Sequence, residues 1–267
     1  MEYAKGIDVS FYQDKAETKD IHIDFTKAVE NNIDFVFIRS SIGLSTDRDF
    51  QLNRKNAKAA GLLRGYYHFL KWEFSGKAQA QYFYNLVKDD LPEIGLVVDF
   101  EQNYKTATPA TAKILLRDFL EELRKLYSKN IIIYTGAFFF EQYGSKDIFF
   151  KQFPLWLASY TDQEYMEQNL DKRLDPWDTW HFWQYSAKGD GKKYGVESLD
   201  LDMDVFNGSK EDLLKFCGLN EQPETETDEL LNQFETQLEQ VKADVDALIV
   251  YSYKLVSLVR EMKQLEK

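Results

Sequence analysis

The segment VVDFEQ, residues 97–102, places two carboxylates one residue apart, directly after an apolar run. Side chains two residues apart on a strand point to the same face, so Asp99 and Glu101 would bring two negative charges close together. Crowding of like charges raises at least one pKa. A protonated carboxyl beside an ionised one can protonate a leaving oxygen while its neighbour stabilises or attacks a sugar cation, which is the chemistry of glycoside hydrolysis. A D-x-E pair at a strand end can also be a plain surface pair or part of a helix cap.

Two further acids occupy comparable positions in other predicted strands. Asp8 ends the run GIDVS, and Asp202 lies in LDLDMDVF, residues 199–206. In a barrel of eight strands the first and last strands are neighbours, and functional groups gather at one end. We therefore expect Asp8 and Asp202 to lie side by side, across the barrel mouth from the first pair. Because Asp200, Asp202 and Asp204 alternate on one face, any of the three could be the site acid.

Aromatic side chains close several of the same strands. They are Tyr66, Tyr67, His68, Phe69, Tyr134, Trp156, Tyr160, Trp183 and Tyr185. Aromatic faces stack on sugar rings and their polar tips bond to hydroxyls, so the set favours a carbohydrate groove. At any one position an outward orientation into a helix layer is an equally good interpretation, because strand residues alternate.

Other reaction types fit the sequence less well. Acid clusters can bind magnesium or calcium, but no loop of alternating acids around a glycine turn is present, and we expect no metal and no other cofactor. The chain has no G-x-S-x-G, G-x-G-x-x-G or P-loop motif. Cys217 lies in a predicted helix away from the strand ends, where it is a small buried apolar residue.

The composition of the chain excludes several classes of binding partner. The chain has 267 residues and a formal net charge of -12, which argues against unaided binding of nucleic acid or of an anionic membrane surface. A single cysteine excludes an internal disulfide. The sequence contains no apolar run of membrane-spanning length and no signal-peptide pattern, so we expect synthesis in the cytoplasm without an export signal. An extracellular role would then need lysis, a dedicated exit route or assembly into a larger particle.

The first region, residues 1–219, alternates eight apolar runs with helical patterns, among them residues 48–60, 77–87 and 109–127. In the last of these, Thr108 is the expected N-cap and Pro109 the first helical residue. Such alternation is typical of an α/β fold with a parallel barrel. The segments after residue 136 are shorter or less regular, which predicts an incomplete TIM-like barrel.

The last region has a different pattern. Residues 220–228, NEQPETETD, form a polar linker, and residues 229–267 repeat apolar residues with spacings of 3 and 4, which predicts a coiled-coil oligomerisation helix. The seam consists of Leu231, Phe234, Leu238, Val241, Val245, Leu248, Ser252, Leu255, Val259 and Met262. We expect a homo-oligomer. The alternative is a terminal helix that packs on its own barrel.

Eight motifs, in order over residues 3–207, carry a family resemblance. The motifs are GIDVSFYQ, FVFIRSS, GYYHF, VVDFE, IYTG, LWLASY, WQYS and DMDVF. Together they resemble glycoside hydrolase family 25, the N-acetylmuramidase lysozymes of bacteria, fungi and phages. The resemblance implies a (β/α)5(β)3 barrel that cleaves the β-1,4 bond between N-acetylmuramic acid and N-acetylglucosamine in peptidoglycan, in the context of bacterial cell wall lysis by a phage, a prophage or a virion.

The resemblance also implies roles for individual residues. Glu101 resembles the general acid, and Asp99 resembles its stabilising carboxylate. Asp8 and Asp202 match flanking acids of the groove. The positions that resemble groove-lining, substrate-binding residues are Tyr67, His68, Tyr134, Trp156, Tyr160 and Gln184.

The chain departs from the family pattern at three points. Tyr12 stands where the family usually has Trp, Asp204 stands where it usually has Asn, and the predicted coiled coil replaces wall-binding repeats. Two other functions stay open beside the hydrolase: a non-catalytic glycan-binding module, and a structural virion component built on the same barrel. The stereochemical course, retaining, inverting or substrate-assisted, is open as well.

Overall fold

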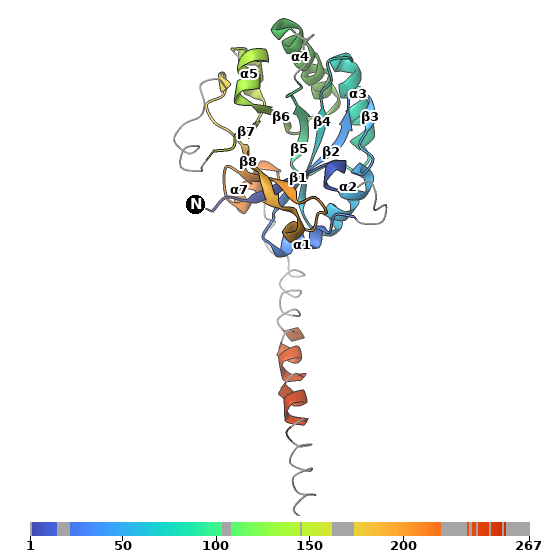
Figure 1. The fold of residues 1–267 in the computed structure, drawn as a ribbon, viewed down its shortest axis with the longest axis vertical. Coiled ribbons are helices and arrows are strands. Elements are labelled where there is room, and N and C mark those ends of the chain that lie inside the picture. Colours follow the sequence, from blue (N-terminus) through green and yellow to red (C-terminus); the bar gives the residue numbers. More distant parts are fainter. Residues whose placement is uncertain are drawn as a thin grey trace, which may run out of the picture. The chain divides into compact units, whose positions relative to one another are not determined.

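Eight strands close into a barrel in the first part of the chain (Figure 1). The computed structural model describes residues 2–14, 22–102, 108–144, 146–161 and 174–219, and in the C-terminal part residues 234, 237–238, 240–245, 247–252 and 254. The strands are β1 (Lys5–Val9), β2 (Phe35–Ile42), β3 (Ser45–Thr46), β4 (Leu63–Phe69), β5 (Gly95–Asp99), β6 (Ile131–Gly136), β7 (Leu155–Ala158), β8 (Phe182–Asp190) and β9 (Asp200–Phe206). The order around the barrel is β1-β9-β8-β7-β6-β5-β4-β2, and β1 also pairs with β2. The ring of strands is therefore closed. The predicted incompleteness of the barrel does not apply to its sheet.

Strand direction differs from the sequence prediction at one place. Strands β1, β2, β4, β5, β6, β7 and β8 pair in parallel, but β9 runs antiparallel to both β8 and β1. The prediction of a parallel barrel is wrong for this last strand. The reason is the connection between β8 and β9, residues 191–199, which contains only the short 3-10 helix η4 (Gly191–Tyr194). A parallel pair needs a longer crossover, whereas a short connection returns the chain antiparallel.

Helices follow the first five parallel strands. They are α1 (Phe25–Glu30), α2 (Phe50–Ala59), α3 (Gly76–Val87), α4 (Pro109–Leu126) and α5 (Ala137–Tyr143), with α7 (Lys210–Phe216) after β9 and the 3-10 helices η1 (Phe11–Gln13) and η2 (Ile148–Gln152) in connections. Helix α4 begins as predicted, because Thr108 Oγ1 accepts from the backbone N–H of Thr111 over 3.2 Å. Helices α2, α3 and α4 lie outside β2, β4 and β5 (Figure 1).

Two hydrophobic layers fix the barrel. The outer layer joins the outward faces of the strands to the helices, and the inner one fills the barrel. The inner layer includes Phe35, Phe37, Ile132, Trp156, Phe182 and Phe206. Two strand glycines make room for these rings, since a Cβ at Gly6 would overlap Phe35 and a Cβ at Gly65 would overlap Phe37. The packed interior blocks a channel through the barrel, so a site formed by the strand ends lies at the mouth.

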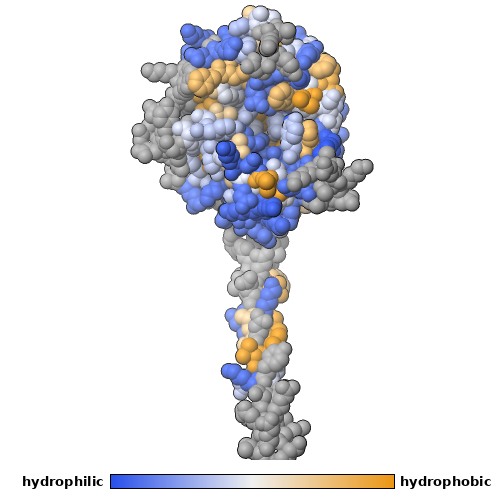
Figure 2. Space-filling view, viewed as in Figure 1, coloured by the Kyte–Doolittle hydropathy of each residue, from blue (hydrophilic) through white to orange (hydrophobic). Residues whose placement is uncertain are grey.

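The chain divides into two units, Met1–Leu219 and Asn220–Lys267. In the second unit, the described residues between 234 and 254 are helical, and Figure 2 shows hydrophobic residues along this segment. The predicted linker and the seam residues Leu231, Leu255, Val259 and Met262 lie outside the described residues. The long coiled coil therefore stays a prediction. Across the described ranges, no helix combines the length and the apolar character needed to cross a membrane.

Candidate active site

A pocket of about 440 Å³ lies among the acids that the sequence singled out, and its volume falls in the range of ordinary ligand sites. Its lining consists of Asp8, Ser10, Tyr12, Gln13, Arg39, Ile42, Tyr67, Phe69, Asp99, Glu101, Tyr134, Trp156, Tyr160, Gln184 and Asp202. All four acids predicted for the site, and every predicted groove residue except His68, are in this set. The carboxyl ends of the parallel strands supply most of them.

The four acids come from three strands. Asp99 is the last residue of β5, and Glu101 follows two residues later, open to solvent. Asp8 is paired with Asp202 across β1 and β9. Because β9 is antiparallel, its first half lies at the mouth, which is why Asp202 reaches the pocket although it does not end a strand. Asp200 is exposed at the start of β9 and is not part of the lining.

Burial and mutual repulsion perturb the acids. Removal from water, and then the charge of Glu101, raise the pKa of Asp99 well above its ordinary value. Desolvation in the pocket wall, followed by the charge of Asp202, raises the pKa of Glu101. Burial and the neighbouring Asp200 raise the pKa of Asp202 to about 6. The pocket therefore retains protons at a pH where isolated carboxyls would have lost them.

Gln184 connects the acids to the aromatic wall. Its Nε2 donates to Asp8 Oδ2 over 2.7 Å, and its Oε1 accepts from the hydroxyls of Tyr134 (3.0 Å) and Tyr160 (3.1 Å). These partners fix the orientation of the amide, since the carboxylate oxygen needs a donor and the phenols need an acceptor. One side chain on β8 thus positions residues from β1, β6 and the end of β7.

The aromatic residues differ in what they offer a ligand. Trp156 is almost fully buried and stacks on Phe37, with ring centroids 4.1 Å apart, so it supports the floor of the pocket. Tyr67 and Tyr134 are also mostly buried and contact Trp156 edge-on or tilted. Tyr160, in contrast, is 65% exposed. It is therefore a better platform for a sugar ring than the three buried rings.

The prediction that His68 lines the groove is wrong. His68 has no exposed surface and lies on the helix side of β4, stacked against Phe83 and Phe119. Its Nδ1 contacts Ser41 Oγ over 2.8 Å, and burial lowers its pKa to about 4, so the ring is neutral. Alternation along β4 is the physical cause: Tyr67 faces inward, so its neighbour must face outward.

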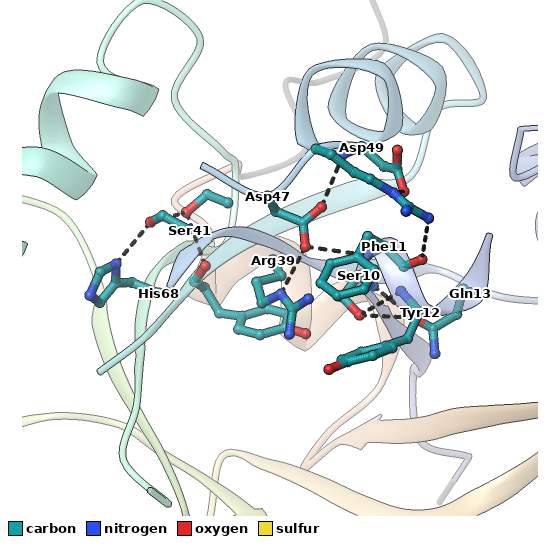
Figure 3. A network of polar contacts seen from close by, with 12 residues as sticks. Ser10, Phe11, Tyr12, Gln13, Arg39, Ser41, Asp47, Asp49 and His68 are labelled. Carbon is teal, nitrogen blue, oxygen red and sulfur yellow. Dashed lines mark hydrogen bonds and ion pairs between the residues drawn. The ribbon is translucent and has the colours of Figure 1, made fainter. Parts of the chain in front are cut away.

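The sequence does not predict four of the lining residues, Ser10, Gln13, Arg39 and Ile42, and Arg39 is the charged one among them. Its Nε donates to Asp47 Oδ2 over 2.8 Å, and its guanidinium lies 4.7 Å from the centre of the Phe11 ring and 5.2 Å from that of Tyr12 (Figure 3). The signal was present, because Arg39 is the one charged residue in the apolar run FVFIRSS. A cation inside a buried strand needs a partner or a function.

The loop after β1 is held by hydrogen bonds of its own. Ser10 N donates to Gln13 Oε1 over 2.7 Å, and Phe11 N donates to Asp47 Oδ2 over 3.2 Å (Figure 3). These contacts place Tyr12, which is 69% exposed, at the edge of the pocket. The described residues contain no group of three or more His, Cys, Asp or Glu side chains arranged to hold a metal ion.

Comparisons with known proteins agree with this architecture. A family model described as glycosyl hydrolases family 25 matches residues 7–194. Lysozyme M1 of Streptomyces globisporus is 30% identical over 224 residues, which cover 79% of this chain and 70% of that protein. The uncharacterized protein YegX of Escherichia coli (strain K12) is 29% identical over 228 residues, which cover 82% of this chain and 75% of that protein.

Solved structures show the same barrel. The bacterial lysozyme from Streptomyces coelicolor has a TM-score of 0.66 at 26% identity, covering 81% of this chain and 98% of that one. A family 25 glycosyl hydrolase from Bacillus anthracis has the same TM-score and identity, covering 80% of this chain and 93% of that one. The acid-lined pocket, the closed barrel and the family match over most of the barrel agree, and the chain therefore belongs to glycosyl hydrolases family 25 and is a glycoside hydrolase.

Proposed function

We propose that the protein is a peptidoglycan hydrolase that cleaves the β-1,4 bond between N-acetylmuramic acid and N-acetylglucosamine. The observation that carries the proposal is the pair of carboxyls at the end of β5, Asp99 and Glu101, whose pKa values are both raised inside one pocket. Raised pKa values let one carboxyl of the pair keep its proton at a higher pH than an isolated carboxyl would, while the other carries the negative charge. Glycoside hydrolysis needs both properties, one for the leaving oxygen and one for the sugar cation.

In this proposal Glu101 is the general acid. It is the more exposed member of the pair, so it can reach the glycosidic oxygen of a polymer that lies in the groove. Asp99 is 4% exposed, and its Oδ1 has no hydrogen-bond partner among the described residues, so it can stabilise a positive charge above it. The positive charge would develop on the sugar ring or on an oxazolinium-like species formed by the substrate's own acetamido group.

The remaining pocket residues have binding roles in the proposal. Asp8 and Asp202 flank the reacting bond. Substrate-binding residues are Tyr67, Tyr134, Trp156, Tyr160 and Gln184. The exposed rings of Tyr160 and Tyr12 would stack on sugars at the pocket edge, while the buried members fix the shape of the wall. The protein would act on the bacterial cell wall, and cell wall lysis would follow. A similar protein from Clostridium acetobutylicum carries the name autolytic lysozyme.

The decisive experiment is digestion of purified peptidoglycan followed by measurement of new reducing ends and mass analysis of the fragments. Muramic acid at the new reducing end would support the proposed bond, and glucosamine there would contradict it. Retention of glycan without any new reducing end would instead favour the non-catalytic binding function. The Glu101→Gln variant controls for a contaminating hydrolase, because it should bind the same glycan without releasing ends.

We also propose that residues 229–267 form a coiled coil that joins copies of the chain. Support comes from the seam positions Phe234, Leu238, Val241, Val245 and Leu248, which are helical or flanked by helical residues and between 47% and 69% exposed. Exposed apolar stripes of this length usually mark an interface. Several barrels tethered near one polymeric wall would raise the effective concentration of each.

A further inference from the structure

Asp204 is a buried acid that the proposed reaction does not use. It lies on β9 with no exposed surface, one inward position deeper in the barrel than Asp202. The indole Nε1 of Trp156 donates to Asp204 Oδ1 over 2.8 Å. Asp204 Oδ2 has no N–H or O–H partner among the described residues. A buried carboxylate oxygen without a donor lowers the stability of the folded protein, so the surroundings of Oδ2 need an explanation.

The neighbour of Asp204 is another carboxyl. Asp8, on the adjacent strand β1, is 6% exposed, and in the part of the chain that the structure describes it accepts one hydrogen bond, from Gln184 Nε2 to its Oδ2. The carboxyl groups of Asp8 and Asp204 lie within hydrogen-bonding contact of each other. Each therefore has one N–H donor on one oxygen and the other carboxyl beside it. Two ionised carboxylates cannot form a hydrogen bond, whereas one proton between them satisfies both.

We propose that Asp8 and Asp204 share a single proton in the folded protein, and that Asp204 is a positioning residue that holds Asp8 at the pocket wall. The proton belongs to the pair and to neither residue alone. The arrangement gives the pair one negative charge in place of two. It also gives Asp8, which lines the pocket, two partners that fix its orientation: Gln184 Nε2 on Oδ2, and the carboxyl of Asp204.

The surroundings of the pair favour the shared proton. Burial is the largest cause that raises the pKa of both Asp8 and Asp204, and the charge of Asp202 raises both as well. The N–H donors Gln184 and Trp156 lower the pKa of Asp8 and Asp204 respectively, while the contact between the two carboxyls raises the pKa of Asp8 and lowers that of Asp204. The other titratable groups that interact with the pair are Asp202 on β9, Tyr67 on β4, Tyr134 on β6, Tyr160 after β7 and Tyr185 on β8. Of these groups, only Asp202 carries a negative charge that resists a second charge on the pair, because the raised pKa values keep the four phenols neutral.

The sign of the pH effect follows. A carboxyl pair with raised pKa binds more protons in the folded than in the unfolded state, so its contribution to stability is present at low pH and is lost as pH rises through the folded-state values. The inference rests on the proposed function only where it gives Asp8 a role beside the reacting bond. The pair itself can be tested without measuring hydrolysis.

The experiment compares the wild type with Asp204→Asn, Asp8→Asn and the double variant. Asparagine keeps an acceptor for Trp156 and offers an N–H donor to the opposite carboxylate, so it replaces the shared proton with a permanent donor. The thermal unfolding midpoint of the wild type should fall as the pH rises from about 5 to about 9. In each single variant this fall should be roughly half as large, and the remainder comes from other acids with raised pKa values. The double variant should reduce the fall no further, because either substitution removes the same proton.

Infrared spectroscopy of protein with carboxyl-labelled aspartate supplies the second readout. The wild type at neutral pH should show the C=O band of a protonated aspartate, and each single variant should lose the intensity of one carboxyl. Asp200→Asn, an exposed acid on the same strand, is the matched control and should keep the band. The proposal of a shared proton would be wrong if the effects of the two substitutions on the unfolding midpoint added up in the double variant. It would also be wrong if the band were lost only on substitution of Asp8. These readouts do not depend on hydrolysis, so they can fail or succeed separately from the proposed function.

Discussion

Gln184 Nε2 and Asp8 Oδ2, which lie 2.7 Å apart, join β8 to β1 across the intervening strand β9. The same amide accepts hydrogen bonds from Tyr134 and Tyr160. One uncharged side chain therefore determines how an acid and two aromatic rings face the pocket. The amide cannot rotate by half a turn without opposing its carbonyl oxygen to a carboxylate and its N–H groups to two phenols that need an acceptor.

Replacing Gln184 with glutamate tests this bridge. Gln184→Glu keeps the shape but removes the donor to Asp8 and adds a carboxyl beside it. Leaving a buried acceptor without its donor costs about 1–3 kcal/mol in the free energy of unfolding, which urea denaturation measures. Hydrolysis should fall as well. Gln152→Glu, an exposed position beside Arg124, is the control and should change neither quantity. If both substitutions changed the free energy of unfolding and the rate of hydrolysis equally, the hydrogen bonds of Gln184 would not be important for the pocket.

Glu101→Gln tests the proposed acid. Removing the proton should lower hydrolysis roughly 10²- to 10⁴-fold, the usual contribution of general acid catalysis. The unfolding midpoint should stay close to that of the wild type, because Glu101 is open to solvent. Glu121→Gln on the exposed side of α4 should keep full activity. Retention of more than about a tenth of wild-type hydrolysis in the Glu101→Gln variant, with an unchanged pH profile, would exclude it as the acid.

The pH dependence of hydrolysis should be bell-shaped, with its maximum on the acidic side of neutral. Activity falls at low pH when the partner carboxylate becomes protonated, and it falls at high pH when the acid loses its proton. Since the pKa values of Asp99 and Glu101 are raised, both limbs lie at higher pH than two isolated carboxyls would give. Initial rates on soluble glycan fragments would show this. A profile that is flat from about pH 4 to about pH 9 is incompatible with a catalytic carboxyl pair.

Gly65→Ala tests the inner packing of the barrel. The new Cβ would overlap the ring of Phe37, and overpacking of this kind typically lowers the free energy of unfolding by about 1–3 kcal/mol. Phe37 stacks on Trp156, so displacement of the ring should also weaken substrate binding. Gly136→Ala is a suitable control because its nearest heavy-atom neighbour would be 3.9 Å away. Chemical denaturation and the KM of hydrolysis check both parts. Equal stability of the two variants would contradict the packing argument.

The C-terminal region gives a prediction about assembly. Light scattering of the full chain should show an oligomer, and a chain that ends at Leu219 should be a monomer that still cleaves soluble glycan. Beta-branched Val241 and Val245 in the seam, with apolar neighbours beside it, favour three or four strands over two. A full-length protein that stays monomeric would rule out self-association through this helix.

Much of the barrel could be predicted because period-2 strands and helix caps are local signals. The capped start of α4 at Thr108 is one confirmed example. The strand-end acids also followed from sequence, and the structure brings Asp8, Asp99, Glu101 and Asp202 to one pocket, while their chemical roles stay predictions.

Two of the differences between prediction and structure, the direction of β9 and the role of Arg39, have physical causes that no local pattern shows. The direction of β9 depends on the short connection between β8 and β9, which makes β9 antiparallel. Because of this direction, Asp202 lines the pocket at the mouth and Asp204 does not. His68 was assigned to the groove together with Tyr67, although adjacent strand residues cannot both face inward. Arg39 was missed because its role depends on Asp47, a partner brought near by the hairpin between β2 and β3.

The pairing of β9 with β1 has a consequence for how the protein forms. The barrel closes between strands from the two ends of its domain, and the neighbours Asp8 and Asp202 come together only in that step. Contacts between distant parts of a chain form slowly, because a large loop must be ordered before they are made. During synthesis, which proceeds from the N-terminus, β1 has no β9 partner until nearly the whole domain has emerged. The pocket is thus assembled last, and the gain of hydrolytic activity during refolding would report the final closure of the barrel.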